Sequence, residues 1–311
     1  MKVSIIIAVY NRQDFIAEAI NSALEQTYQD IEIIIVDDGS TDNTAAIIKE
    51  FEKASPHKII YLYQANSGAA SARNAAINIA SGELASFLDS DDIYEKNKTE
   101  MQVKFWQQHP QASFVYSGYT IFNMNTKEST IIKPLDKMQG DIKSKLWTVE
   151  NNIWGGTMLV PMKHLKTLNG FDSSLRGAEN FDLRLKLAKL GPVYFQDQLL
   201  SIYRIHNTNL SQQDKLNRPK YLKVISNQLD NSENQPLFRF VMSNYHYRSG
   251  MFLFQKQQYY QAMLAFLKSI QKKPLQLKSY IQILRCTLGE KINNKLRNLE
   301  AATKKTQKGR S

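Results

Sequence analysis

Four short apolar runs in the first third of the sequence constrain the fold of this chain more than any other feature. All four are rich in β-branched residues, and they are VSIIIAV (3–9), IEIIIVD (31–37), KIIYLY (58–63) and LASFLD (84–89). Such runs are typical of strands covered on both faces. The stretches between them have helical spacing, as with Phe15, Ala19 and Ile20. Strands joined by crossover helices predict an α/β fold with a mostly parallel, doubly wound sheet.

Composition excludes several other classes of protein. The chain has 311 residues, of which 42% are hydrophobic, so we expect a sizeable core rather than disorder. Cys286 is the only cysteine, which excludes an intrachain disulfide and a cysteine-based zinc cluster and favours a reducing compartment. No apolar run approaches the roughly 18 residues of a membrane-spanning helix, and we interpret the apolar run 3–9 as a buried strand rather than a signal peptide.

The formal charge of +11 is unevenly distributed along the chain. Residues 1–210 hold 21 Lys/Arg and 24 Asp/Glu, a net of −3, whereas residues 211–311 hold 19 and 5, a net of +14. The basic character therefore belongs to the last third alone. This distribution argues against a nucleic-acid-binding protein.

Polar residues follow three of the four predicted strands. Tyr10 and Asn11 follow the first strand, Asp37 and Asp38 end the second, and the tetrapeptide DSDD (89–92) ends the fourth. Because the carboxyl ends of parallel strands meet at one edge of a sheet, we expect these side chains to lie together. A single acidic turn is usually a helix cap, but two acidic clusters at one edge repel each other and favour a bound cation. Oxygen ligands indicate Mg²⁺ or Mn²⁺, ions that commonly bridge a protein to a diphosphate.

Four segments, in order, resemble family 2 glycosyltransferases with the GT-A fold. They are SIIIAVYN, IIIVDDGSTDNT, NSGAASARNAAINIASGELASFLDSDD and GFDSSLRGAENFDLRLKLA. The resemblance covers about residues 1–210. It implies a Rossmann-like sheet and the transfer of a sugar from a nucleotide diphosphate, usually UDP, to an acceptor with inversion at the anomeric carbon. It also implies dependence on Mn²⁺ or Mg²⁺.

Carried over position by position, the resemblance assigns five residues to the nucleotide of the donor. Asp38 would accept a hydrogen bond from the nucleobase, with Asp37 beside it. Arg73 would reach the base and fix the orientation of the donor. Tyr10 and Ser90 complete this set of donor-binding residues.

Five further positions are assigned to the metal, the diphosphate and the sugar. Asp89 and Asp91 form the family's Asp-x-Asp pair. Asp89 would bind ribose or metal-bound water, and Asp91 would ligate the metal against the diphosphate. Asp92 is expected to face the sugar. In the polar stretch after the predicted last strand (LLSIY, 199–203), Arg204 would pair with phosphate and His206 would complete the coordination of the metal, although a lone loop histidine is more often a surface residue.

The sequence departs from the family pattern where the catalytic base is expected. The family usually has Glu-Asp-x-Asp-Leu, with the second residue as the base, whereas this chain has ENFDL (179–183). The amide of Asn180 cannot take up a proton. Glu179 with a shifted acceptor is our preferred base, and Asp182 is an alternative on the same helix. A catalytically impaired relative that still binds the donor is a third interpretation.

Just upstream, Gly155 and Gly156 lie where the acceptor usually enters, and small residues there let backbone approach a ligand closely. Trp154 is equally consistent with stacking on a sugar ring and with a place in the core. The sequence predicts neither the donor sugar nor the acceptor.

The last third has a different pattern, which predicts two domains with a boundary at residues 211 and 212. Residues 212–311 are predicted to be helical and basic. Within them, residues 243–276 fit one tetratricopeptide-like unit, which we interpret as a helical hairpin packed on the catalytic domain, with a peptide-binding repeat as the alternative. The tail, residues 291–311, carries seven Lys/Arg and one Glu. It is consistent with an anionic membrane surface and equally with a solvated tail.

Together these features predict a metal-dependent, inverting glycosyltransferase with a nucleotide-sugar donor and a saccharide or lipid-linked acceptor. We expect a cytoplasmic protein, peripheral on the inner face of the membrane, that binds no nucleic acid. The alternatives are the impaired nucleotide-sugar-binding relative and a scaffold that recruits partners through its helical tail. The sequence carries no prediction of the oligomeric state.

Overall fold

The computed structural model describes residues 1–133, 139–142, 146, 153–209, 224, 227–229 and 235–287. The chain divides into two compact units, Met1–Val224 and Ile225–Ser311. The boundary predicted at residues 211 and 212 falls outside the described residues and stays a prediction, as does the membrane contact of the tail, residues 291–311.

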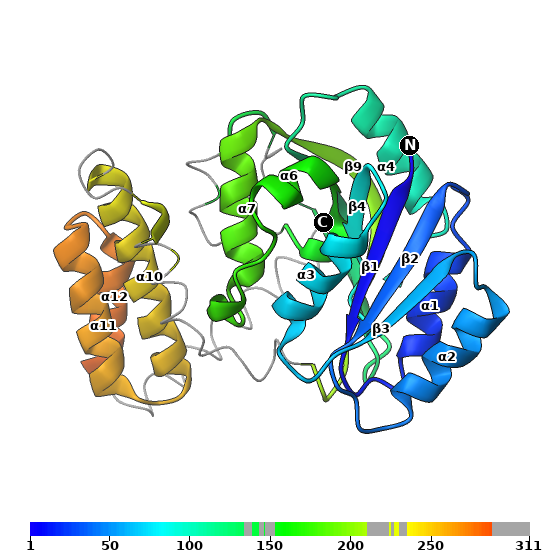
Figure 1. The fold of residues 1–311 in the computed structure, drawn as a ribbon. Coiled ribbons are helices and arrows are strands. Elements are labelled where there is room, and N and C mark those ends of the chain that lie inside the picture. The colour runs from blue at the N-terminus through cyan, green and yellow to red at the C-terminus, as the bar shows by residue number, and fades with distance from the viewer. Residues whose placement is uncertain are drawn as a thin grey trace, which may run out of the picture. The chain divides into compact units, whose positions relative to one another are not determined.

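Within the described residues, the first unit contains one nine-stranded sheet (Figure 1). The strand order is β3-β2-β1-β4-β8-β6-β9-β5, and β7 pairs with β6. The strands are β1 (Val3–Val9), β2 (Ile31–Asp37), β3 (Ile59–Tyr63), β4 (Leu84–Phe87), β5 (Ile93–Tyr94), β6 (Phe114–Asn123), β7 (Ser129–Ile132), β8 (Met158–Pro161) and β9 (Val193–Ile205).

The first four strands confirm the predicted α/β class. β1 pairs in parallel with β2 and β4, and β2 pairs in parallel with β3. All seven residues of β2 are buried, as the β-branched run IEIIIVD indicates for a central strand. The other half of the sheet is mixed, because β8 runs antiparallel to both β4 and β6, a reversal that the sequence pattern did not predict.

Helices cover both faces of the parallel strands. The helices and 3-10 turns of the first unit are α1 (Ile16–Leu24), α2 (Thr44–Ala54), α3 (Ala69–Ile79), α4 (Lys98–Gln107), η1 (Gly155–Thr157), α6 (Met162–Thr167), η2 (Ser173–Leu175) and α7 (Glu179–Leu190). Ile16 and Ile20 of α1 pack in one core cluster with the odd-numbered residues of β1, such as Ile5. The chain order reverses after β3, so α3 packs on β1 and β2 from the other face. The strand order thus changes direction beside β1, which is where ligands bind in such sheets.

β9 is longer than the predicted last strand. The run LLSIY (199–203) is its central part, and the strand continues to Ile205, parallel to β6. Arg204 therefore lies in the strand and not in the loop that follows it.

The second unit contains α10 (Gln235–Gln255), α11 (Tyr259–Lys272) and α12 (Leu277–Thr287). α10 and α11 pack around Phe254, Ala262 and Phe266. A Cβ atom on Gly250 would lie 2.5 Å from the ring of Phe266, so glycine is what lets this ring lie against α10. Among the helices that the structure describes, none is long and apolar enough to cross a membrane.

Candidate active site

The carboxyl ends of β1, β2 and β4 bring the predicted polar residues to one edge of the sheet. Val9 is paired with Asp37, and the Asp38 amide donates to the Val9 carbonyl at 2.8 Å. The Leu88 amide, just before Asp89, donates to the carbonyl of Ile6 on β1 at 2.9 Å. Tyr10 is exposed at this edge, and Ser90 is buried beside it.

Asp37 is fully buried and holds the turn that follows β2. It accepts hydrogen bonds from the Ser40 amide at 2.8 Å and from the Tyr61 hydroxyl at 3.1 Å. Burial, and then the charge of Asp37, raise the pKa of Tyr61 above its usual value, so this hydroxyl keeps its proton and remains a donor. Asp37 thus shapes the edge of the site through contacts within the protein.

Asp38 anchors the loop that leads into α3. Its carboxylate accepts from the Gln64 side chain at 2.7 Å, from the Ser67 amide at 2.8 Å and from the Gly68 amide at 2.7 Å. Gly68 has φ +92°, a conformation that favours glycine, and this geometry turns its amide toward the carboxylate. A ligand that bonds to Asp38 would therefore share an oxygen that already accepts from the protein.

Arg73 joins the end of β4 to the start of α7. Its Nη2 lies 2.9 Å from Asp89 Oδ1, and its Nη1 lies 3.5 Å from Glu179 Oε1. The guanidinium also lies over the ring of Phe171, with 5.4 Å to the centroid. One buried cation is therefore shared by a residue of the Asp-x-Asp pair and the preferred candidate base.

Trp154 holds the other oxygen of Asp89. Its indole nitrogen donates to Asp89 Oδ2 at 3.2 Å, and its ring lies 5.3 Å from the rings of both Tyr119 and Tyr203. A Cβ atom on Gly156 would lie 2.5 Å from the indole, so the glycine makes room for the ring. Trp154 is thus part of an aromatic cluster that also fixes a site carboxylate.

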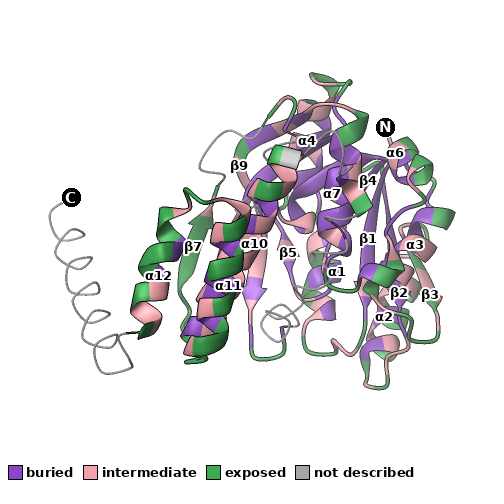
Figure 2. Cartoon of the chain, turned by 90° about the vertical axis from the view of Figure 1, so that its left-hand side faces the viewer, coloured by how far each residue is buried: buried purple, intermediate pink, exposed green. Residues whose placement is uncertain are grey.

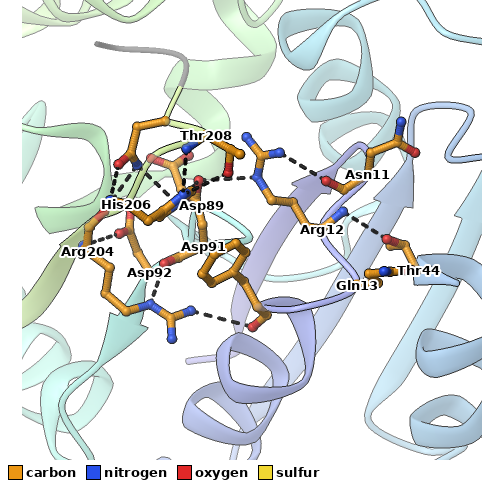
Figure 3. A network of polar contacts seen from close by, with 12 residues as sticks. Asn11, Arg12, Gln13, Thr44, Asp89, Asp91, Asp92, Arg204, His206 and Thr208 are labelled. Atoms are coloured by element: carbon orange, nitrogen blue, oxygen red, sulfur yellow. Dashed lines mark hydrogen bonds and ion pairs between the residues drawn. The ribbon is translucent and has the colours of Figure 1, made fainter. Parts of the chain in front are cut away.

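Asp91 lies between two basic side chains (Figure 3). Its Oδ2 is 3.3 Å from Arg12 Nε and 3.2 Å from His206 Nε2. The His206 ring stacks on Phe15 at 4.2 Å, and its Nδ1 contacts the Thr208 hydroxyl at 2.9 Å. The predicted pair Asp91 and His206 is therefore brought together, with the guanidinium of Arg12 at the same oxygen.

Sequence reasoning missed Arg12, although it directly follows the Tyr10-Asn11 strand end. The loop that carries it is fixed by Asn11, whose side-chain oxygen accepts from the Thr41 amide at 2.8 Å and whose φ is +50°. The Arg12 amide donates to the Thr44 hydroxyl at 2.9 Å. The sequence did contain a signal for Arg12. It is a basic residue directly after the end of a strand, and that end of the strand faces acidic loops.

Asp92 does not face a sugar site, which corrects the expectation drawn from the resemblance. It is fully buried, and its Oδ1 accepts from the Arg204 amide at 2.7 Å. Its Oδ2 has no hydrogen-bond partner among the described residues. Burial, and then the charges of Asp91 and Asp89, raise the pKa of Asp92 well above its ordinary value. Asp92 therefore braces β9 against the site instead of projecting into it.

Arg204 is almost completely buried, with protein partners around its guanidinium. It forms an ion pair with Glu18 of α1, donates to the Asp91 carbonyl and lies 5.4 Å from the centroid of the Phe15 ring. The predicted pairing of Arg204 with a phosphate would require these contacts to break. In this arrangement Arg204 positions the backbone of the tetrapeptide 89–92.

The predicted catalytic segment opens α7. Glu179 Oε2 accepts from the Gly177 amide at 2.6 Å, and Oε1 lies 3.4 Å from the Asn180 side-chain nitrogen. The Asn180 side chain lies against Gly155. A Cβ atom added to Gly155 would be 3.3 Å from the side-chain oxygen of Asn180. Asp182 is buried and forms an ion pair with Lys186 at 2.6 Å. Of the two carboxylates, Glu179 is the one beside Arg73 and Gly177.

Another buried basic side chain, which the sequence did not predict, contacts β4. Lys98 of α4 donates to the Ser86 hydroxyl at 3.0 Å and to the Gln102 side-chain oxygen at 2.6 Å, and it lies 4.1 Å from the centroid of the Tyr94 ring. Burial lowers the pKa of Lys98 to about 7. Ser86 is three residues before Asp89, so this contact fixes the strand that carries the acidic loop.

Asp91 and His206 are a fitting ligand pair for a divalent cation, with one carboxylate oxygen and one imidazole nitrogen that converge. Both oxygens of Asp89 are held by Arg73 and Trp154. The described residues contain no group of three or more His, Cys, Asp or Glu side chains placed to hold a metal. Such a pair suits an ion that takes its other ligands from a diphosphate and water.

Comparison with known families gives one match, the model described as glycosyl transferase family 2, over residues 4–167. An uncharacterized glycosyltransferase of Rickettsia typhi is 33% identical over 262 residues, which cover 83% of this chain and 81% of that protein. The putative teichuronic acid biosynthesis glycosyltransferase TuaG of Bacillus subtilis is 33% identical over 212 residues, 67% of this chain and 81% of that protein. Some relatives are longer, and the chain matches 34% of the Rickettsia conorii protein.

Solved structures of similar fold include TarS and a mannosyltransferase. TarS 1–349 of S. aureus in complex with UDP-GlcNAc has a TM-score of 0.68 and 19% identity, over 92% of this chain and 89% of that chain. The mannosyltransferase PcManGT of Pyrobaculum calidifontis, in complex with GDP-Man and Mn²⁺, has a TM-score of 0.64 and 17% identity, over 92% and 79%. At these identities the likeness shows the fold alone, and it confirms the predicted architecture.

Proposed function

This chain belongs to glycosyl transferase family 2 and is a glycosyltransferase, and from that premise we propose that it transfers a sugar from a UDP-sugar to a saccharide or lipid-linked acceptor. We propose inversion at the anomeric carbon and dependence on Mn²⁺ or Mg²⁺. The observation that carries the proposal is the meeting of the Arg73–Asp89 ion pair and the Asp91–His206 pair at the carboxyl ends of β1, β2 and β4.

The donor side of the proposal rests on Asp38, Arg73 and Asp89. Asp38 fixes the loop before α3, which carries Arg73, and Arg73 in turn orients Asp89. The UDP-GlcNAc bound to TarS and the GDP-Man bound to PcManGT support a nucleotide sugar as the donor class. The name of TuaG supports an acceptor in surface polysaccharide assembly, for which we propose the cytoplasmic face of the membrane as the location.

Asp91 and His206 would hold the divalent ion. When bound, such an ion neutralises the charge that develops on the departing nucleotide diphosphate. Arg12 contacts the same Asp91 oxygen, so Arg12 and a bound cation would compete for it. His206 is oriented for this role by its stacking on Phe15 and its contact with Thr208.

We propose Glu179 as the general base. The Gly177 amide fixes one oxygen of the carboxylate, and the other faces Asn180 and Arg73. This oxygen would take the proton of the acceptor hydroxyl as that hydroxyl attacks the anomeric carbon from the face opposite the leaving diphosphate. Asp182 is less suited, because it is more deeply buried and its carboxylate lies 2.6 Å from Lys186 Nζ, whereas Glu179 Oε1 lies 3.5 Å from Arg73 Nη1.

A second candidate function follows from Asn180 at the usual base position. The chain would then bind the nucleotide sugar without efficient transfer. The same experiment separates the two candidates: release of nucleotide diphosphate is measured across UDP- and GDP-sugars with Mn²⁺, beside UDP binding by calorimetry. Turnover supports the enzyme, binding without turnover selects the impaired relative, and the absence of both overturns the donor site itself.

The metal pair is tested by Asp91→Asn, with the exposed Asp197→Asn as the matched control. We expect Asp91→Asn to abolish the stimulation of turnover by Mn²⁺ and Asp197→Asn to leave it unchanged. Asp197 lies on β9 and pairs with Lys133 at the surface, so its loss removes the same charge away from the site. Equal stimulation of both variants would exclude Asp91 as a metal ligand.

A further inference from the structure

The described helices of the second unit carry charged side chains of one sign only. Between residues 235 and 287 the sequence contains eight basic residues and no Asp or Glu. They are Arg239, Arg248, Lys256, Lys268, Lys272, Lys273, Lys278 and Arg285. Three consecutive helices therefore carry positive charge with no carboxylate of their own, which favours an anionic partner.

α12 differs from an ordinary surface helix in which side chains it buries. It buries the polar residues Ser279 and Gln282. Ile283 packs against the core of the unit, whereas four other large apolar side chains of α12 are exposed, and they are Leu277, Tyr280, Ile281 and Leu284. Their spacing of i, i+3, i+4 and i+7 puts them on one face, which we call the α12 stripe. Leu277 is 70% and Leu284 62% exposed, so large parts of these side chains lie in water.

The neighbouring helix adds exposed apolar residues. Tyr260, Leu264 and Leu267 of α11 are exposed, and Leu275 in the turn between α11 and α12 is 82% exposed, the highest value among the exposed large hydrophobic residues. Figure 2 shows exposed residues along both α11 and α12. Lys268 follows Leu267, and Lys278 follows Leu277 at about 100° round the helix, beside the α12 stripe. Apolar and basic residues are thus interleaved in the sequence of this part of the unit.

The three helices hold together without the α12 stripe. The Ser243 hydroxyl donates to the Ser269 carbonyl at 2.9 Å, and the Ser269 hydroxyl donates to the Ser243 carbonyl at 2.8 Å. The Ser279 hydroxyl donates to Ser269 Oγ at 3.0 Å, which joins α12 to α11. These serine contacts lie beside the apolar cluster of Phe254, Ala262 and Phe266, and together they hold the unit while the α12 stripe stays outside its packing.

We propose that the α12 stripe inserts into the headgroup boundary of an anionic membrane, with the interleaved lysines contacting lipid phosphates. An interfacial position fits the amphipathic character of α12, and no helix among the described residues is long and apolar enough to cross a membrane. The insertion buries the exposed Leu, Ile and Tyr side chains, and the basic side chains add electrostatic attraction. The proposal concerns where the protein lies and does not depend on the sugar transfer proposed above.

Charge disfavours the other occupants of this surface. The same surface on a second copy of the chain would bring eight positive charges against eight. The chain's own residues 288–311 hold seven Lys/Arg and two Glu, so they too would meet the unit with the same sign of charge. An anionic surface is the partner that removes both the apolar exposure and the uncompensated charge.

The test is co-sedimentation of the full chain with vesicles of phosphatidylcholine, with and without phosphatidylglycerol. We expect binding only to the anionic vesicles, and weaker binding in about 1 M salt, where charges are screened beyond about 3 Å. The double variant Ile281→Gln and Leu284→Gln should lower the vesicle partition coefficient by at least about tenfold. Leu284→Met, which keeps an apolar side chain, should retain binding.

Ile131→Gln is the matched control, because Ile131 is 63% exposed on β7 in the first unit. It should bind vesicles like the unchanged chain, and all variants should keep the same helical circular dichroism. Unchanged partition of the α12 double variant would overturn the proposal and assign any vesicle binding to residues outside the α12 stripe. A change of oligomeric state in that variant by light scattering, with no change in vesicle binding, would also overturn it and identify self-association.

Discussion

Two neighbouring carboxylates of the acidic loop, Asp91 and Asp92, lie in opposite environments. Asp91 is partly exposed beside Arg12 and His206, whereas Asp92 is fully buried under β9. Only the first can exchange its partners for a ligand. At the residue scale, the chemistry of this loop therefore depends on which way each aspartate points.

The proposed base gives a direct prediction. Glu179→Gln keeps the size of the side chain and removes its ability to take a proton, so kcat should fall by about 10²–10⁴-fold with little change in KM for the donor. The measurement is steady-state release of nucleotide diphosphate. Glu83→Gln, at an exposed position away from the site, is the control. Full activity of Glu179→Gln would instead require another base.

A companion substitution separates the two candidate functions. If Asn180 is what limits the chain, Asn180→Asp restores the usual base and raises turnover. If Glu179 is the base, the added carboxylate in contact with it repels its negative charge and turnover does not rise. Initial rates of the two single variants and the double variant, taken as a cycle, distinguish these outcomes.

Arg12 and a metal ion compete for Asp91 Oδ2, which gives a second residue-scale prediction. Arg12→Gln removes the guanidinium at 3.3 Å and leaves the carboxylate without that cation. We expect Mn²⁺ to bind several-fold more tightly, because the carboxylate has lost a competing cation. A tenfold change in affinity corresponds to about 1.4 kcal/mol. Calorimetric titration with Mn²⁺ measures it, with Lys96→Gln at an exposed position as the control. Weaker Mn²⁺ binding by Arg12→Gln would mean that Arg12 and the ion do not compete for this oxygen.

At the scale of elements, Glu32 of β2 shows how one carboxylate fixes a turn. It accepts from the Ser4 hydroxyl at 2.6 Å, from the Ser81 amide at 2.7 Å and from the Gly82 amide at 3.0 Å. Burial alone would raise the pKa of Glu32, but hydrogen bonds from Lys2, Ser4 and Ser81 outweigh it and lower the pKa to about 2. These contacts hold the turn between α3 and β4, and so set where the acidic loop begins.

Because the pKa of Glu32 is depressed in the folded state, its stabilisation is complete above the ordinary value of 4.5 and is lost as the pH falls through about 2. Over this window the free energy of unfolding should fall by about 3 kcal/mol from this group alone. Glu32→Gln should lower the stability at neutral pH and flatten this part of the pH profile. Urea unfolding at several pH values measures both effects, and an unchanged slope in the variant would refute them.

The elements of the parallel sheet could be predicted closely from sequence. The runs 3–9 and 31–37 coincide with β1 and β2, because continuous β-branched runs have few alternatives to a buried strand. The long strand β9 was predicted only in its centre, since Arg204 and its polar neighbours resemble a loop until Asp92 and Glu18 are known to lie beside them.

The site was predictable as a set of residues but not as a set of contacts. Clustered carboxylates after strands located Asp38, Asp89 and Asp91. Nothing local in the sequence indicates that Arg12 reaches Asp91 or that Asp92 is buried, because these contacts join segments that are far apart in the chain. Long-range pairing of this kind is decided by tertiary packing.

At the scale of the whole molecule, the two units have separate cores. The first is built around the sheet, and the second around Phe254, Ala262 and Phe266. Each core can therefore be perturbed by substitutions in its own unit, which gives the last prediction.

We expect Phe266→Ala to destabilise the second unit by about 3–5 kcal/mol. In calorimetric unfolding, Phe266→Ala should lower the temperature of one transition. The other transition, whose temperature rises when UDP and Mn²⁺ are added, should stay unchanged. Leu264→Ala, at an exposed position on the same helix, should have little effect. A single transition that shifts as a whole in Phe266→Ala would show that the two units unfold cooperatively.

The contact between Asp91 and His206 joins residues that are 115 positions apart in the chain. β9, which carries the chain to His206, pairs with β6 and β5, so the pair can form only after this late strand has been synthesised and has joined the sheet. A ribosome-bound chain that already holds β1 to β4 therefore has the acidic loop without its histidine. The site therefore becomes complete only late in synthesis, when β9 has joined the sheet.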